Sequence, residues 1–296
     1  MGLPLPHGKL AMWLFLVTEI MFFTALIGTY VLLRNGTPVP LHQNEKYEPG
    51  TYTAAHHWPT PEHVHLEEWI GAGNTFVLIC SSLTVVLALW AMNRGNVRQA
   101  TLFIGITFAL GLLFLLVKAY EYNQKIKHDI LPGHIGDHLD GPTGAWYKER
   151  VRGQLNDIVK AHALSKETLD ECQELLHDMD GAIEEPSKEY RPALSAVTLG
   201  DRVDHLLHEA EEKRHESPPI SPAIDFGNMW ASCYFAMTGF HALHVFGGLV
   251  IFVIILLMGV RGRLGPQHSP MLEYTGLYWH FVDIVWIFLF PLLYLV

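Results

Sequence analysis

The chain has 296 residues, of which half are hydrophobic and 17% are charged, and its mean hydropathy is +0.19. This composition is too apolar for an ordinary soluble protein of that length and indicates an integral membrane protein. The formal net charge of −10 at pH 7 gives no reason to expect nucleic acid as a partner.

Five segments are long and apolar enough to cross a bilayer, at residues 9–34, 68–92, 97–123, 226–260 and 272–296. About 20 apolar residues, each rising 1.5 Å along a helix, cross a hydrocarbon core of roughly 30 Å. No small-residue cleavage site follows the first segment, so we expect a retained helix and not a removed signal peptide. The sequence therefore predicts an all-α fold, a polytopic membrane bundle of five transmembrane helices.

The short loops carry a modest charge bias that predicts orientation. With the N-terminus in the cytoplasm, the inner segments hold five Lys and Arg residues and the first outer segment holds two. We therefore expect the C-terminus and the long connection between the third and fourth helices to lie on the outer side. The inner residues are Lys9, Arg94, Arg98, Arg261 and Arg263, and the outer ones are Arg34 and Lys46.

The connections predict three regions. Residues 1–124 hold the first three helices and a histidine-rich outer loop at 35–67, residues 125–224 form an extramembrane insertion, and residues 225–296 hold the last two helices.

The insertion is acidic, with twelve Lys and Arg against twenty Asp and Glu. Its apolar residues recur at helical spacing between 155 and 176 and again between 203 and 210, which predicts two helices in a hairpin-like module. The acidic surface could attract a basic partner, or it could be a solvated face without one.

The cysteines of the chain and the histidines of the outer loop give little sign of a built metal site. Cys80, Cys172 and Cys233 have no paired spacing and fit small core residues better than ligands. The outer loop is rich in histidine and could bind metal adventitiously, through His42, His56, His57, His63 and His65. We expect no dedicated metal ligand in this chain.

Three polar residues lie deep in the apolar segments. Glu19 is roughly 15 Å into the first helix, and His280 and Asp283 lie roughly 12–17 Å into the fifth, on one helix face. Because charged groups are costly at that depth, we expect the three to form a hydrogen-bonded cluster. It could handle protons or a lipid headgroup, or it could only fix helix packing, which is the simpler interpretation for His280 and Asp283.

His241 and His244, also three residues apart, could ligate a metal only with further ligands that the helices do not supply. Lys118 and Glu121 lie near the outer end of the third helix, where their charges could reach the interface. Residues expected in helix packing or a lipid cleft are Trp13, Asn74, Glu121, His241, His244, Trp279 and Arg261.

In order along the chain, five motifs resemble subunit III of haem-copper terminal oxidases, the cytochrome c oxidase group in particular. The motifs are LFLVTEIMFF at 14–23, Asn74-Thr75 with Ser81-Ser82, KAYEY at 118–122, TGFHALHV at 238–245 and YWHFVD at 278–283. The chain resembles the shorter bacterial form, because two helices before the Glu19 segment are missing, and its long insertion has no counterpart in the family pattern.

The resemblance implies a subunit without a redox centre that packs against oxidase subunits I and II, which hold the haem and copper. It implies structural phospholipids in a helix cleft and a role for Glu19 near the proton-uptake route. It also implies a bacterial plasma membrane location, with cytochrome c or another respiratory complex as a candidate partner of the acidic insertion. The alternatives are a quinol oxidase subunit III, a nitric oxide reductase-associated homologue and, in a different class, an independent ion transporter.

Overall fold

The structure is a computed structural model with two compact units, described separately below. The bundle unit comprises Met1–Gly36, Leu66–Glu121 and Cys233–Val296, and the insertion unit comprises Thr37–His65 and Tyr122–Ser232. The described residues are 7–35, 58–61, 64–135, 141–180, 182–184, 189–191, 193–224 and 227–295.

Five helices in the described part of the chain are long and apolar enough to cross a membrane, which confirms the predicted all-α polytopic bundle. The third continues four residues beyond its predicted end, and Lys125 and Lys127 in its last turn suit the negative end of the helix dipole. The fifth ends at Phe290, and a π-helical turn, η2 (Pro291–Leu295), follows it. The five are α1 (His7–Arg34), α2 (Glu68–Asn93), α3 (Val97–Lys127), α7 (Gly227–Val260) and α8 (Ser269–Phe290), the last preceded by η1 (Pro266–His268).

A tight turn joins α2 to α3. Gly95 has a φ of +77°, a conformation that favours glycine, and its N–H donates to the carbonyl of Met92 while the N–H of Asn96 donates to that of Ala91. The Asn96 side chain then accepts from the N–H of Gln99 and caps α3. The sequence thus ends one transmembrane helix and starts the next within three residues.

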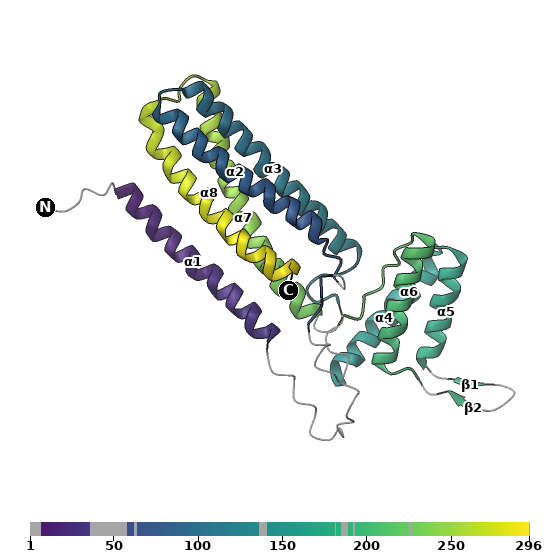
Figure 1. Ribbon diagram of the computed structural model, residues 1–296. Coiled ribbons are helices and arrows are strands. Elements are labelled where there is room, and N and C mark those ends of the chain that lie inside the picture. The colour runs from purple at the N-terminus through teal and green to yellow at the C-terminus, as the bar shows by residue number, and fades with distance from the viewer. Residues whose placement is uncertain are drawn as a thin grey trace. The chain divides into compact units, whose positions relative to one another are not determined.

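Within the bundle unit, α8 runs beside α2 and α1, as Figure 1 shows. The ring of Trp279 is fully buried, and a Cβ added at Gly111 of α3 or Gly248 of α7 would lie 2.8 or 2.7 Å from it. Its Nε1–H donates to Ser81 Oγ of α2 at 2.9 Å. Two glycines therefore allow one large ring to join four helices.

Helix α1 contributes little buried surface. Of its described residues, only Phe23 and Tyr30 are buried, whereas Trp13, Met21 and Leu32 are among many exposed apolar side chains. Such a surface suits contact with lipid or with another membrane chain.

The described part of the insertion unit contains three helices of its own, not the predicted two. The predicted first helix is interrupted at 162–165, where His162 has a φ of +51°, so it divides into α4 (Gly141–Ala161) and α5 (Lys166–Asp180). The third is α6 (Ala196–Arg214). A short antiparallel pair, β1 (Ala182–Glu184) and β2 (Glu189–Arg191), lies between α5 and α6.

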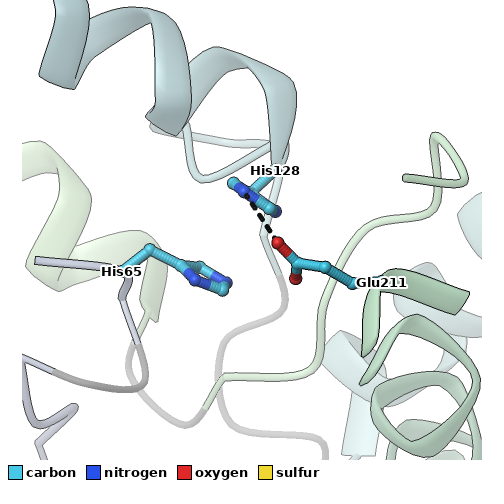
Figure 2. Close-up of side chains that lie close together, drawn as sticks. All are labelled: His65, His128 and Glu211. Carbon is cyan, nitrogen blue, oxygen red and sulfur yellow. Dashed lines mark ion pairs between the residues drawn. The ribbon is translucent and has the colours of Figure 1, made fainter. Parts of the chain in front are cut away.

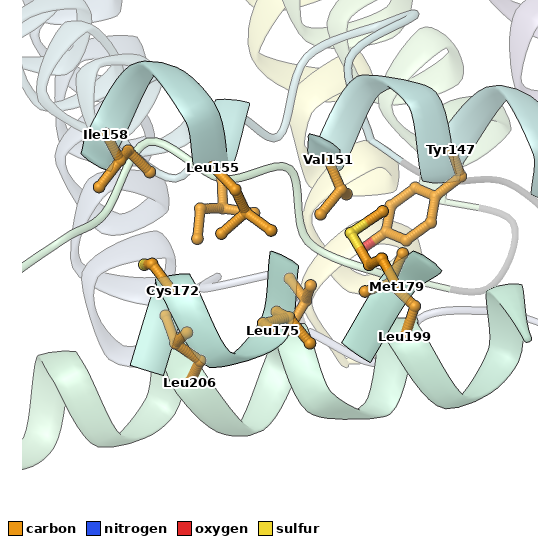
Figure 3. Packing of buried hydrophobic residues seen from close by; sticks show 11 residues of the cluster. Tyr147, Val151, Leu155, Ile158, Cys172, Leu175, Met179, Leu199 and Leu206 are labelled. Atoms are coloured by element: carbon orange, nitrogen blue, oxygen red, sulfur yellow. The ribbon is translucent and has the colours of Figure 1, made fainter. Parts of the chain in front are cut away.

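The three insertion helices enclose a single apolar core (Figure 3). Val151, Leu155 and Cys172 are fully buried in it, and burial raises the pKa of the Cys172 thiol to about 11. Ser165 and Thr168 at the start of α5 both donate to the carboxylate of Glu216, at 3.1 and 2.6 Å. This contact ties the chain after α6 to the beginning of α5.

Candidate functional site

Three of the polar contacts between helices of the bundle unit involve titratable side chains that the sequence singled out. The first joins α1, α7 and α8. His244 Nε2 lies 3.1 Å from Glu19 Oε2, and the two side chains are only 18% and 21% exposed. The Tyr278 hydroxyl donates to the His244 carbonyl at 2.8 Å.

Glu19 and His244 together must share a proton. His244 Nδ1 lies 2.7 Å from the Phe240 carbonyl, which can only accept, so Nδ1 carries a hydrogen. The contact between Nε2 and Glu19 then requires either an imidazolium beside a carboxylate or a neutral imidazole beside a carboxylic acid. A proton could pass between Nε2 and Oε2 without disturbing any other contact of the pair.

The second contact joins α2 and α8. Ser82 Oγ lies 2.5 Å from His280 Nδ1 and also interacts with the Asp283 side chain. The expected cluster of Glu19 with His280 and Asp283 is therefore wrong in its pairing. Glu19 faces His244 of α7, whereas His280 and Asp283 face Ser82 of α2.

The two histidines of α7 contact different neighbours and do not form a ligand pair. His241 is buried, and its Nε2–H donates to the Val282 carbonyl at 3.1 Å. Its ring lies against Phe114 and Trp286, with centroids 5.6 and 4.9 Å away. His244, by contrast, faces α1.

The third contact lies between α3, α7 and the C-terminal turn. Lys118 and Glu121 are 3% and 9% exposed, and Lys118 Nζ donates to Glu121 Oε1 at 2.8 Å. The Tyr234 hydroxyl also donates to Oε1, and the Tyr294 hydroxyl donates to Glu121 Oε2 at 2.6 Å. The expectation that these charges reach the interface is wrong, because the helix directs both toward its neighbours.

Three buried polar atoms of the bundle unit have no hydrogen-bond partner among the described residues. They are Asn74 Oδ1, His241 Nδ1 and Asp283 Oδ1. The Asn74 amide does donate to the Phe114 carbonyl at 3.4 Å, which links α2 to α3. Buried atoms of this kind are places where ordered water binds.

An apolar cleft of about 540 Å³ opens between α1, α7 and α8. Tyr278, which also donates to the His244 carbonyl, forms part of its wall. Trp13 and Arg261 are exposed outside this wall, on α1 and directly after α7. Other lining residues are Met12, Phe15, Gly247, Ile251 and Tyr274.

Sequence reasoning singled out Ser82 as a contact of the second helix but missed the tyrosine hydroxyls. Ser82, Tyr234, Tyr278 and Tyr294 each meet a charged or titratable group or its backbone from another helix. Serine and tyrosine carry no strong signal in an apolar segment. The YWHFVD motif included Tyr278, but its contact with α7 depends on how the helices rotate.

These features define a polytopic membrane protein whose deep polar groups mostly bond across its own helices. Residues 215–296, which include α7 and α8, match the family model described as cytochrome c oxidase subunit III. Over these residues the chain is similar to cytochrome c oxidase subunit III, the family that the resemblance of its motifs predicted.

Relatives match nearly the whole chain. It is 25% identical over 292 residues to cytochrome c oxidase subunit 3 of Thermostichus vulcanus, covering 97% of this chain and 86% of the relative. It is 24% identical to the probable cytochrome c oxidase subunit 3 of Mycobacterium tuberculosis, strain H37Rv, covering 95% and 84%. Against the Corynebacterium diphtheriae protein of the same family the identity is 23%, with the same coverage.

Proposed function

We propose that this chain is the subunit III of a proton-pumping cytochrome c oxidase, without a redox centre of its own. The observation that carries the proposal is similarity across at least 95% of the chain to proteins named as cytochrome c oxidase subunit 3. The chain stabilises oxidase subunits I and II, which hold the haem and copper. The exposed apolar surface of α1 supports such packing.

A second part of the proposal is that the apolar cleft holds a phospholipid. Its volume of about 540 Å³ and the aromatic and aliphatic residues of its wall suit an acyl chain. Ile251→Trp should fill the cleft and lower the amount of phospholipid that purifies with the complex. Ile254→Trp, an exposed position on the same helix, serves as the matched control and should leave the lipid content unchanged.

A third part assigns Glu19 to proton uptake, in combination with His244. The support is the shared proton that their hydrogen bonds require, at a depth where an isolated charge would be costly. Tyr278 connects this pair to the cleft, so lipid in the cleft would limit water access to it.

Glu19→Gln tests this role, with Thr18→Ala on the same turn as control. Glutamine keeps the size of the side chain but cannot exchange a proton. We expect the assembled complex to oxidise its donor at the starting rate and then to lose activity faster during turnover, while the control keeps its activity. Immediate loss of the haem spectrum in Glu19→Gln would contradict this role.

We also propose that the protein lies in a bacterial plasma membrane with its N-terminus in the cytoplasm, and that the insertion meets a partner outside. The excess of acidic residues in the insertion supports attraction of a basic cytochrome c or another respiratory complex. Deleting 130–220 should leave the bundle intact and weaken that docking. Unchanged donor affinity together with unchanged supercomplex migration would contradict it.

A further inference from the structure

Three side chains in the insertion unit bring metal-ligating atoms together from distant parts of the sequence. His65 lies three residues before α2, His128 directly follows α3, and Glu211 belongs to α6 (Figure 2). One ligand atom from each lies within 4.8 Å of the others. This cluster is separate from the polar contacts of the bundle unit.

The arrangement leaves room between the ligand atoms. The rings of His65 and His128 are stacked, with centroids 4.1 Å apart and planes inclined by 15°. His128 Nε2 is 4.0 Å from Glu211 Oε1, too far for a direct hydrogen bond. Ligands at the usual zinc distances are roughly 3.3 Å apart in a tetrahedral site, and a metal lies in the plane of each imidazole that binds it, so the stacked rings must rotate and Glu211 must move closer for an ion to bind. The Glu211 side chain is 53% exposed and can make that movement.

The charges around His128 act in two directions on a cation. The C-terminal end of the α3 dipole adds partial negative charge beside His128. Lys125 and Lys127 act in the opposite direction, because their positive charges repel a cation.

The backbone at this site is unusual. His65 and Asp129 have φ values of +50° and +53°, in the left-handed region that residues other than glycine rarely adopt. These conformations fix the direction of the chain next to both histidines. Strain of this kind is tolerated where the surrounding structure or a ligand compensates for it.

We propose that His65, His128 and Glu211 bind a divalent first-row transition metal such as Zn²⁺. Two imidazoles and one carboxylate suit zinc, and three protein ligands leave a fourth position for water. The bound ion would join the segment before α2, the end of α3 and α6. It would thereby hold α6 in place within the insertion unit.

The test uses the full chain, purified in mild detergent through a tag without histidine and stripped of metal. Zn²⁺ is titrated against a chromophoric chelator, and Co²⁺ binding is followed by its visible absorption. We expect one tight site per chain, and His65→Gln, His128→Gln or Glu211→Gln should each weaken it at least about tenfold, since even outer-shell changes cost that much. Each variant should also lose the Co²⁺ absorption of the wild type.

His205→Gln, at an exposed position of α6 outside the cluster, is the control and should bind Zn²⁺ as the wild type does. Circular dichroism checks that the variants keep their helices, and Glu211→Gln, a change at an exposed side chain, is the variant least expected to misfold. Equal Zn²⁺ affinity in the wild type and all three ligand variants would overturn the proposal. An equal loss of affinity in His205→Gln would also overturn it, because binding would then be spread over surface histidines.

Discussion

The buried ion pair of α3 offers a sharp test of how the bundle holds together. In Lys118→Met the side chain keeps its length but loses its charge, which leaves the Glu121 carboxylate buried with only two tyrosine hydroxyls as donors. Glu121→Gln leaves the Lys118 ammonium without its anion. Each change therefore leaves one buried charge without the opposite charge beside it.

The size of the effect follows from that burial. Lys118 and Glu121 are only 3% and 9% exposed, so solvent screens them little. Breaking a buried ion pair by removing one partner costs about 3–5 kcal/mol, whereas replacing both with neutral groups is often nearly neutral. We expect each single variant to lose about 3–5 kcal/mol and the double variant Lys118→Met/Glu121→Gln to recover most of that loss.

The assay is unfolding of the full chain in mild detergent, followed by tryptophan fluorescence and circular dichroism. Trp286 is a local reporter, since Lys118 Nζ lies 5.0 Å from the centre of its ring. Lys9→Met is the matched control, because it breaks the exposed pair with Glu273 and should have a much smaller effect.

Two results would show that the Lys118–Glu121 ion pair does not stabilise the bundle. One is a single-variant loss no larger than that of Lys9→Met. The other is a double variant as unstable as the sum of the two single variants, since additivity would mean that Lys118 and Glu121 do not interact.

Two further variants test packing and pH dependence. Gly248→Ala should destabilise the bundle by about 1–3 kcal/mol, because the new Cβ would lie 2.7 Å from the Trp279 ring; Gly105→Ala, whose nearest neighbour would be 3.7 Å away, should melt like the wild type. The hydrogen bond from Thr168 is the main cause that holds the pKa of Glu216 below its ordinary value of 4.5. The stability that Glu216 contributes should therefore be fully present above pH 4.5 and be lost as pH falls through the lower folded pKa. Unfolding of the insertion helices can be followed by circular dichroism at several pH values. The stability of the wild type and that of Glu216→Gln should differ at pH 7 and become equal in acid. A difference in stability that stays constant with pH would contradict this role of Glu216.

The five transmembrane helices could be predicted because length and apolarity alone determine them. The depth of Glu19, His280 and Asp283, counted in residues along each helix, stays a prediction. Their partners could not be predicted, because pairing depends on helix rotation. Glu19 meets His244, and His280 meets Ser82, on neighbouring helices.

Two other differences have similar causes. Lys118 and Glu121 lie near a helix end, where sequence alone does not distinguish a charge that reaches the interface from one that meets Tyr234 or Tyr294. In the insertion, apolar spacing continues across the break at 162–165 and hides the boundary between α4 and α5. His42, His56, His57 and His63 of the predicted histidine-rich loop, and the last residue of the predicted fifth helix, lie outside the described residues.

We propose above that this chain works as part of a cytochrome c oxidase. The most direct measurement is purification in mild detergent through a tag on this chain, followed by an optical spectrum and mass spectrometry of the proteins that accompany it. We expect the purified material to show haem absorbance, copper and large polytopic partner subunits, and to oxidise cytochrome c and not a quinol. A colourless protein that purifies alone would contradict it.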